Sequence, residues 1–428
     1  MEKPEKLIEL ERPPIIETAV LARVVLPSDS DEDVEESLEE MRQLAWTAGA
    51  EVGCTVLQRR LKPCPGTLVG RGKAEEIKAA VDELSADLVI FDSNLSPAQG
   101  SKLEEILGVK VVDRTQLILD IFAQRAHTNE GKHQVELAQL QYMLPRLAGR
   151  GSIMRQQGGI GVRGPGEQKL EVDRRVIRNR IARLKAEIEN IRKGRQVQRQ
   201  RRSEGTISTV ALVGYTNAGK SSLLNRLTSA DVFVEDKLFA TLDPRARRCR
   251  LSRQREVVLT DTVGFIRKLP HSLVAAFRAT LEEVKEADLL LLVADAAHPA
   301  IEDHIRAVYD VLEEIGALDK PIAIVLNKID IAETDRVGQL TRGGGIRWAV
   351  SARTGEGCET LLAGIERLLG SNRSRVRLRI PQSEAGLVAR VYKSGQVFHQ
   401  DYDGNDIVLE AEIDATLEGV LAEYIACV

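Results

Sequence analysis

The 428-residue sequence has few aromatic residues and no apolar stretch long enough to cross a membrane. Phe, Trp and Tyr make up 4% of the chain, which predicts cores built from Val, Leu, Ile and Ala. The longest uncharged apolar run, 289–294, is bounded by Asp288 and Asp295. It falls far short of the roughly 18 residues that a membrane-spanning helix needs. The charged N-terminus lacks the apolar segment of a secretory signal.

Cysteine is also scarce, and acidic and basic residues are unevenly spread. The five cysteines, without CxxC spacing, are Cys54, Cys64, Cys249, Cys358 and Cys427. This pattern argues against a structural zinc site and against a fold held by disulfides, and it fits a protein of the reducing cytoplasm. The net charge of −4 argues against nucleic-acid binding, but this value is the sum of strongly acidic and strongly basic segments. Residues 29–40 carry eight acids and no base, a pattern that we interpret as the solvated start of a helix.

The length predicts a protein of two to four domains, because an ordinary domain has roughly 100–200 residues. The order of strands and helices predicts the multidomain α/β class. Strands are expected at 20–26, 52–57, 88–91 and 109–112, and helices at 35–48, 74–84 and 99–107. Alternating strands and helices predict βαβ units and a small parallel sheet. This N-terminal α/β domain is expected to span residues 1–128.

The next segment, 129–205, predicts a long antiparallel helical hairpin. Apolar residues recur at helical spacing from Val135 to Leu147 and again from Val172 to Ile191. The predicted tip loop between them, 149–166, holds seven glycines, three arginines and no acid. Its glycines permit close backbone approach to a partner, and its charge indicates that the partner is anionic.

The second helix of this hairpin is strongly basic. From 168 to 202 the sequence has thirteen lysines and arginines against four acids, a net charge of +9. A solvated coiled-coil face is one interpretation, while the adjacent Arg/Gly loop favours contact with a phosphate backbone. Few aromatic residues are present for stacking, so folded RNA is favoured over single strands. The predicted RNA-binding residues are Arg150, Arg155, Arg163, Lys169, Arg174, Arg175 and Arg178.

Two further domains are expected after the hairpin. Residues 206–370 predict a doubly wound α/β sheet, with strands at 208–213, 256–260, 289–294, 322–327 and 347–350. The last part, 371–428, predicts a small α+β domain, with strands at 376–380, 386–392, 396–402 and 406–412 before a terminal helix.

The segment GYTNAGKS at 214–221 carries the strongest motif, GxxxxGK[ST] between a strand and a helix. This context predicts a loop whose backbone N–H groups cradle the α- and β-phosphates of a nucleotide. Lys220 would reach the β- and γ-phosphates and Ser221 would ligate Mg²⁺. The predicted binding residues here are Gly214, Tyr215, Thr216, Asn217, Ala218, Gly219, Lys220, Ser221 and Ser222.

The choice of guanine over adenine is predicted by two later segments. The carboxylate of an Asp after a strand accepts two N–H bonds from guanine and would be left buried and unpaired with adenine. Asp330 has this place, Asn327 can tie the segment to the phosphate loop, and Lys328 can cover the base. The predicted guanine-binding residues are Asn327, Lys328, Ile329 and Asp330, with Ser351, Ala352 and Arg353.

Two segments between these motifs predict the switch that senses the γ-phosphate. Asp261 is expected to hold Mg²⁺ through water, and the Gly264 N–H to reach the γ-phosphate. Thr241 would supply a second hydroxyl to Mg²⁺, so that its loop orders with GTP. These nucleotide-binding segments are Phe239, Ala240, Thr241, Leu242 and Asp243, and Asp261, Thr262, Val263 and Gly264. Lys220, Thr241 and Gly264 are the predicted catalytic residues.

Two residues bear on how hydrolysis would be accelerated. Phe265 follows Gly264, where Ras-like GTPases carry a glutamine that orients water. Because phenylalanine has no group for this task, we expect slow intrinsic hydrolysis and help from a partner or cation. Asn217 has the place of an asparagine that helps to hold K⁺ in some cation-stimulated GTPases. It could equally serve only to stabilise the loop, and the sequence leaves both interpretations open.

Several segments together resemble the HflX family of ribosome-associated GTPases, of the translation-factor-related class. They are LVGRGKAEEI (68–77), VELAQLQYMLPRL (135–147), GGIGVRGPGEQKLEVDRR (158–175), GYTNAGKSSLLN, LFATLDP and DTVGFIRKLP. The resemblance runs from about residue 15 to 370. It implies binding to the large ribosomal subunit and its rRNA, hydrolysis of GTP to GDP stimulated by the ribosome, and splitting or rescue of stalled ribosomes. The hairpin tip would then contact rRNA near the peptidyl-transferase region.

Alternative functions are a GTPase of ribosomal-subunit maturation and a regulatory GTPase switch without an RNA partner. The resemblance also admits ATP hydrolysis, for which the turn at 70–73 is a candidate N-terminal site and a plain helix start is the other interpretation. A monomer in the cytoplasm is expected.

Overall fold

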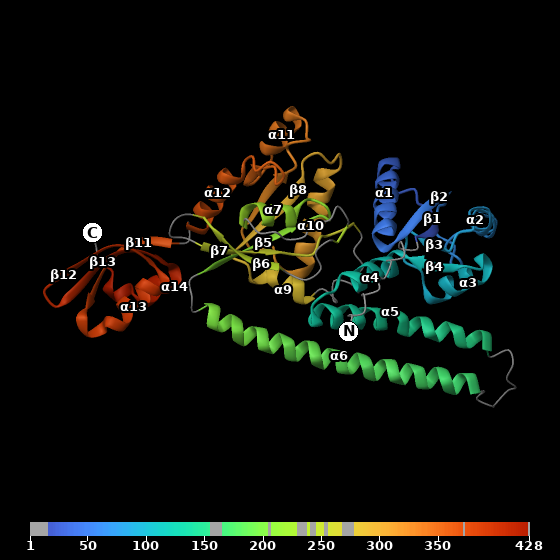
Figure 1. Cartoon of the computed structure of the whole chain (residues 1–428), viewed down its shortest axis with the longest axis horizontal. Coiled ribbons are helices and arrows are strands. Elements are labelled where there is room, and N and C mark those ends of the chain that lie inside the picture. The colour runs from blue at the N-terminus through green and yellow to red at the C-terminus, as the bar shows by residue number, and fades with distance from the viewer. Residues whose placement is uncertain are drawn as a thin grey trace, which may run out of the picture. The chain divides into compact units, whose positions relative to one another are not determined.

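A computed structural model of the chain describes residues 16–154, 165–203, 207–228, 238–239, 245–251, 256–267, 278–370 and 373–426 (Figure 1). The chain divides into two compact units, Met1–Arg125 with Val135–Leu184, and Ala126–Gln134 with Lys185–Val428. The sheets of the described residues have four, six and three strands. Along the described part of the chain, no helix is both long and apolar enough to span a bilayer.

The N-terminal domain contains a parallel sheet with the strand order β2-β1-β3-β4, as its alternating sequence pattern predicts. Its elements are β1 (Glu17–Val25), α1 (Asp31–Ala48), β2 (Ala50–Arg59), α2 (Arg71–Leu84), β3 (Leu88–Phe91), α3 (Pro97–Leu107), β4 (Lys110–Asp113) and α4 (Arg114–Arg125). Val20, Ala22 and Val24 of β1 alternate toward one face, where they join a core with Ile77 of α2 and Leu103 of α3. On the other side, α1 packs with α4.

Side-chain caps determine where two of these helices begin. The Ser30 hydroxyl accepts a hydrogen bond from Asp33 N at 3.1 Å, and three acids of the 29–40 run, Asp31, Glu32 and Asp33, lie in the first turn of α1. This placement stabilises negative charge at the positive end of the helix dipole. At α3, Ser96 and Gln99 form a reciprocal capping box and Pro97 opens the first turn.

The predicted helical hairpin is present as α5 (Asn129–Met154) and α6 (Pro165–Ser203). Both helices extend into the predicted tip loop 149–166, because a long helix propagates through single glycines at about 1 kcal/mol each. The central residues of that loop, 155–164, lie outside the described residues. Arg180 of α6 donates to both carboxylate oxygens of Glu136 on α5, at 2.6 and 2.7 Å. This bidentate pair joins the two helices.

The next sheet has the strand order β10-β9-β8-β5-β7-β6. Its elements are β5 (Ser208–Gly214), α7 (Lys220–Thr228), β6 (Arg245–Arg250), β7 (Glu256–Asp261), α9 (Arg278–Glu286), β8 (Leu289–Asp295), α10 (Ile301–Ile315), β9 (Ile322–Asn327), α11 (Thr334–Thr341), β10 (Arg347–Ala349) and α12 (Cys358–Gly370). All the strands expected here form and pair in parallel. The edge strand β6 was not expected, since its sequence RARRCR buries only Cys249, and it pairs antiparallel with β7.

The C-terminal sheet is antiparallel, with the strand order β11-β13-β12. Its elements are β11 (Arg373–Pro381), the 3₁₀ helix η2 (Gln382–Glu384), α13 (Ala385–Ser394), β12 (Gln396–Asp403), β13 (Asp406–Asp414), α14 (Ala415–Val420) and the 3₁₀ helix η3 (Ala422–Tyr424). The strand expected at 386–392 is wrong, because these residues form α13. Val388 and Val391, three residues apart, both pack into the core with Leu409 of β13, which is helical and not strand periodicity. The exact limits of the four domains stay predictions.

Candidate functional site

The segment 214–221 forms the turn between β5 and α7, and its glycines have conformations that other residues rarely adopt. Gly214 has φ +154°, and a Cβ there would lie 2.2 Å from the carbonyl oxygen of Val293. Gly219 has φ +89°, and a Cβ there would lie 2.2 Å from Asn327 Nδ2. Both positions therefore require glycine. The turn packs closely against β8 through Gly214 and against the end of β9 through Gly219.

Lys220, the first residue of α7, is buried with its ammonium group inside this turn. Its Nζ donates to the carbonyl oxygens of Gly214 at 3.0 Å and Tyr215 at 2.8 Å. Burial lowers the pKa of Lys220 to about 8, and the charge of Asp261 opposes this shift. The ammonium is thus fixed beside the backbone that would surround a phosphate, where a negative ligand would restore the stability of its charged form.

Two oxygen ligands suitable for a hard cation meet at the carboxyl edge of the sheet. The Ser221 hydroxyl donates to Asp261 Oδ2 at 2.6 Å, and Asp261 is buried at the end of β7. Carboxylate and hydroxyl oxygens are the donors that Mg²⁺ prefers. These two residues fit a magnesium ion between the loop and β7.

The segment after β7 packs directly on the phosphate loop. Phe265 N donates to Gly214 O at 3.1 Å, and Thr216 N donates to Phe265 O at 2.8 Å. A Cβ at Gly264 would lie 2.7 Å from Thr216 Cγ2 and 3.1 Å from Lys220 Nζ, so only glycine approaches this closely. The Phe265 side chain is buried. A buried phenyl ring has no polar group that could orient an attacking water molecule.

Tyr215 joins the same segment to α10 through contacts that sequence reasoning missed. Its ring stacks on that of His304 with centroids 3.8 Å apart, and its hydroxyl accepts a hydrogen bond from Arg267 N at 2.9 Å. Burial, with the charges of His298 and Arg267, lowers the pKa of His304 to about 3. His304 is therefore a neutral ring at neutral pH. No sequence signal marks it, because it lies within an ordinary amphipathic helix.

Asn327 connects the phosphate loop to the segment after β10. Its Nδ2 donates to Ala218 O at 2.9 Å, and its Oδ1 accepts from Ala352 N at 2.9 Å. Both bonds are buried, so the amide of one side chain fixes two loops that are far apart in the sequence. Removal of this side chain would leave two buried backbone groups unpaired.

Asp330 and Lys328 lie at the edge of the same sheet. Asp330 Oδ1 accepts from the Ser351 hydroxyl at 2.8 Å, and Arg353 lies 3.9 Å from the other carboxylate oxygen. Lys328 has φ +64°, and its Nζ contacts Asp295 Oδ2 at 2.7 Å. The carboxylate is thus oriented by its neighbours while it keeps acceptor capacity for the paired N–H groups of a guanine edge.

Other predicted site residues are only partly described. Phe239 is buried with φ +55°, whereas 240–244, which include Thr241, and Arg155 and Arg163 lie outside the described residues. Arg150 and Lys169 belong to α5 and α6, respectively. On α6, Arg175 and Arg178 are exposed and Arg174 is partly exposed.

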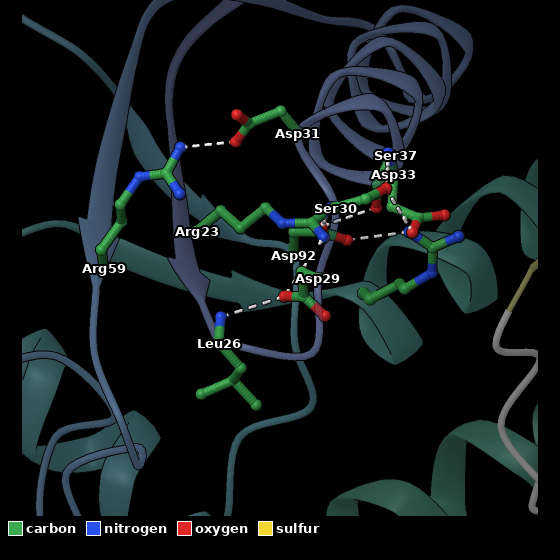
Figure 2. Close-up of polar contacts among 10 residues, drawn as sticks. Arg23, Leu26, Asp29, Ser30, Asp31, Asp33, Ser37, Arg59 and Asp92 are labelled. Atoms are coloured by element: carbon green, nitrogen blue, oxygen red, sulfur yellow. Dashed lines mark hydrogen bonds and ion pairs between the residues drawn. The ribbon is translucent and has the colours of Figure 1, made fainter.

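The carboxyl edge of the N-terminal sheet is filled by its own charged side chains (Figure 2). Arg23 of β1 contacts Asp92, which follows β3, at 2.7 Å, and Ser37 of α1 donates to the same oxygen at 2.7 Å. Arg114 donates to the other oxygen of Asp92 at 2.8 Å and also contacts Glu40. Ligands of open α/β sheets bind at this edge, but here buried ion pairs occupy it.

The turn at 70–73 begins α2 and packs against β2. Gly70 N donates to Gln58 Oε1 at 2.9 Å, and a Cβ at Gly70 would lie 2.7 Å from the Arg60 guanidinium. These contacts are those of a packed helix start. A nucleotide site at this turn, and ATP hydrolysis by the chain, stay predictions.

Comparison with known proteins identifies the family. Residues 35–123 match the family described as GTP-binding GTPase N-terminal, residues 125–202 match GTP-binding GTPase Middle Region, and residues 209–328 match 50S ribosome-binding GTPase. The GTPase HflX of Caldanaerobacter subterraneus subsp. tengcongensis is 48% identical over 410 residues, which are 96% of this chain and 94% of that protein. The chain belongs to the HflX family of GTPases. It is a P-loop GTP hydrolase, as its motifs predict.

Other HflX proteins are similarly close. The GTPase HflX of Escherichia coli (strain K12) is 47% identical over 380 residues, 88% of this chain and 88% of that protein. A solved structure of a GTP-binding protein from the archaeon Sulfolobus solfataricus in complex with GDP is 28% identical, with a TM-score of 0.44, and the match covers 83% of this chain and 99% of that chain.

The lowered pKa of Lys220 predicts how GTP affinity of this HflX-family chain depends on pH. The protonated ammonium is the form expected to bind phosphate, so affinity should be constant below the pKa of about 8 in the free protein. Above it, each pH unit should weaken binding about tenfold. Calorimetric titration of GTP between about pH 7 and pH 9 measures this. An affinity that is flat over this range would show that Lys220 keeps its ordinary pKa.

Proposed function

We propose that this chain binds the large ribosomal subunit and uses GTP binding and hydrolysis to split or rescue stalled ribosomes in the cytoplasm. The observation that carries the proposal is the pairing of a 50S ribosome-binding GTPase domain at 209–328 with a strongly basic helix, α6. We further propose that Mg²⁺ is held by Ser221, by Thr241 and, through water, by Asp261, and that Asn217 is the K⁺ contact if hydrolysis is cation-stimulated.

The basic face of α6 supports an anionic partner. Arg175, Arg178 and Lys185 are exposed and recur at spacings of three and seven, so they share one side of the helix. Among the residues that the structure describes, none of these three forms an ion pair. Arg180, by contrast, is neutralised by Glu136. An unneutralised row of cations is the surface that a phosphate backbone binds, with release of counterions.

Charge reversal at the hairpin tip tests the RNA contact. With Arg155→Glu and Arg163→Glu combined, affinity for purified large subunits should fall about 10²-fold or more, because each lost charged contact contributes roughly 1.5–3 kcal/mol. The slope of log affinity against log salt should decrease by about one per arginine, while GTP affinity stays unchanged. The matched control carries Arg71→Glu and Arg248→Glu, two exposed arginines elsewhere. Full particle binding by the tip variant would disprove the assignment of these residues.

Splitting is tested with stalled ribosomes. Incubation with the full chain and a non-hydrolysable GTP analogue should convert them to free subunits on a sucrose gradient, and GDP should not. Binding restricted to immature particles would instead favour subunit maturation. Binding that needs no RNA would favour a regulatory switch with a protein partner.

A further inference from the structure

The segment QYMLPR on α5 carries contacts that nucleotide binding does not use. Asp113, the last residue of β4, is the centre of these contacts, and its side chain is 1% exposed. Arg146 of α5 donates to Asp113 Oδ2 at 2.9 Å and to the carbonyl oxygen of Leu95 at 2.8 Å. One guanidinium thus bonds the residue that ends β4 and the loop that follows β3, both in the N-terminal domain.

Tyr142 completes this cluster. The Arg146 guanidinium lies over the Tyr142 ring at 3.3 Å from its centroid, and its NH1 donates to Tyr142 O at 3.1 Å. Burial raises the pKa of Tyr142, and so do the charge of Asp113 and the hydrogen bond to it. Stacking and the planar fork of donors restrict Arg146 to a single orientation.

The carboxylate of Asp113 has few acceptor sites left. Oδ2 also accepts from Leu95 N at 3.0 Å, and Oδ1 accepts from Gln116 N at 2.9 Å. Because the Asp113 side chain itself is buried, loss of Arg146 would leave an uncompensated charge in the protein. This distinguishes the cluster from surface pairs such as Arg71–Glu75, in which Arg71 is 93% exposed and the pairing contributes little.

The cluster lies where α5 leads into the predicted tip. Arg146 is one helical turn before Arg150, the first of the predicted RNA contacts. Pro145 precedes Arg146 inside the helix and removes one backbone hydrogen bond. The bond from Arg146 to Asp113 lies directly after this proline and attaches the weakened part of α5 to the end of β4.

We propose that Asp113, Tyr142 and Arg146 form a lock that fixes the direction of α5 on the N-terminal sheet and so positions the hairpin tip for RNA. The N-terminal domain then contributes to particle recognition without touching the RNA through this cluster. The inference rests on the proposed function, because it explains how the same tip reaches its partner. Arg146 and Tyr142 are positioning residues.

Three single variants of the full chain separate a lock from a direct contact. Asp113→Asn and Tyr142→Phe remove no positive charge, whereas Arg146→Met removes one. Each should weaken binding to purified large subunits at least about tenfold while leaving GTP affinity and basal GTP hydrolysis unchanged. The salt dependence should keep its slope in all three, since no phosphate contact is lost. Arg71→Met is the matched control and should bind as the unmodified chain does.

Hydrogen exchange and a double variant provide two further tests of the lock. Amide hydrogen exchange of the free protein should increase in the peptide from 140 to 154 for each variant. The double variant Asp113→Asn/Arg146→Met should bind no more weakly than the worse single variant, because both changes break one unit. If only Arg146→Met weakens binding, and the salt slope falls by about one, Arg146 contacts RNA itself and the lock is refuted.

The outcomes also separate the inference from the proposed function. If the unmodified chain does not bind large subunits, the proposed function fails. If it binds, and Tyr142→Phe binds equally well despite faster exchange, the proposed function stands and the lock is wrong. Because Tyr142→Phe removes a single oxygen, this variant should fold even if the other two do not, and it then tests the lock by itself.

Discussion

Replacement of Asp330 by asparagine is expected to change the preferred base from guanine to xanthine. We expect the carboxylate to accept two N–H bonds from guanine, whereas an amide would accept one and repel the other with its own N–H group. One bond is then lost and the other no longer ends on a charged oxygen. Because each hydrogen bond to a charged group contributes about 1.5–3 kcal/mol, GTP affinity should fall by up to about 10²- to 10⁴-fold. Xanthosine triphosphate, with a carbonyl where guanine has an amino group, should bind the variant more tightly than GTP.

Competition binding of the two nucleotides measures this exchange of preference. Asp335→Asn, which makes the same charge change at an exposed position in the first turn of α11, is the control and should leave GTP preferred. The bond from the Ser351 hydroxyl to Asp330 Oδ1 should survive with the amide oxygen as acceptor, so the orientation of the side chain is retained. A variant that still prefers GTP over its xanthosine analogue would show that Asp330 does not contact the base.

The second large effect is expected from Lys220→Ala. The buried ammonium is already positioned by Gly214 O and Tyr215 O. Phosphate binding therefore costs little free energy for ordering the lysine side chain. Loss of a buried, hydrogen-bonded charge partner weakens binding by about 3–5 kcal/mol, which is roughly 10²- to 10⁴-fold in affinity. Calorimetry with GDP and with a GTP analogue should therefore detect almost no binding.

Lys285→Ala, on the exposed side of α9, is the matched control for loss of one lysine. It should bind nucleotide normally. A thermal melt shows whether each variant remains folded, which separates loss of the phosphate ligand from loss of the domain. Affinity of the folded Lys220 variant within a few-fold of the unmodified chain would contradict the role given to Lys220.

Much of the fold follows from sequence periodicity. The strands β5, β8 and β9 are buried on both faces, and such strands have nearly continuous apolar sequences that are recognised directly. The edge strand β6 could not be recognised, because its arginines face solvent and its pairing with β7 determines its conformation. In the short segment 386–392, periods of two and three are hard to distinguish, and packing on the C-terminal sheet selects the helix.

The site is predictable where chemistry requires a residue type at a fixed spacing. Gly214 and Gly219 are recognisable since only glycine fits their backbone and surroundings, and the structure brings Lys220, Asp261 and Asn327 to one edge of the sheet. Contacts across the fold carry no such spacing. The stacking of His304 on Tyr215 and the contact of Arg146 with Asp113 depend on tertiary packing, so the sequence alone does not reveal them.

We propose that the nucleotide state of the GTPase domain controls binding to the large ribosomal subunit. The most direct test of this proposal is the affinity of the full chain for purified large subunits, measured in one buffer with a non-hydrolysable GTP analogue and with GDP. We expect binding at least about tenfold tighter with the analogue, equivalent to roughly 1.4 kcal/mol of coupling. Equal affinities in the two nucleotide states, or none in either, would contradict it.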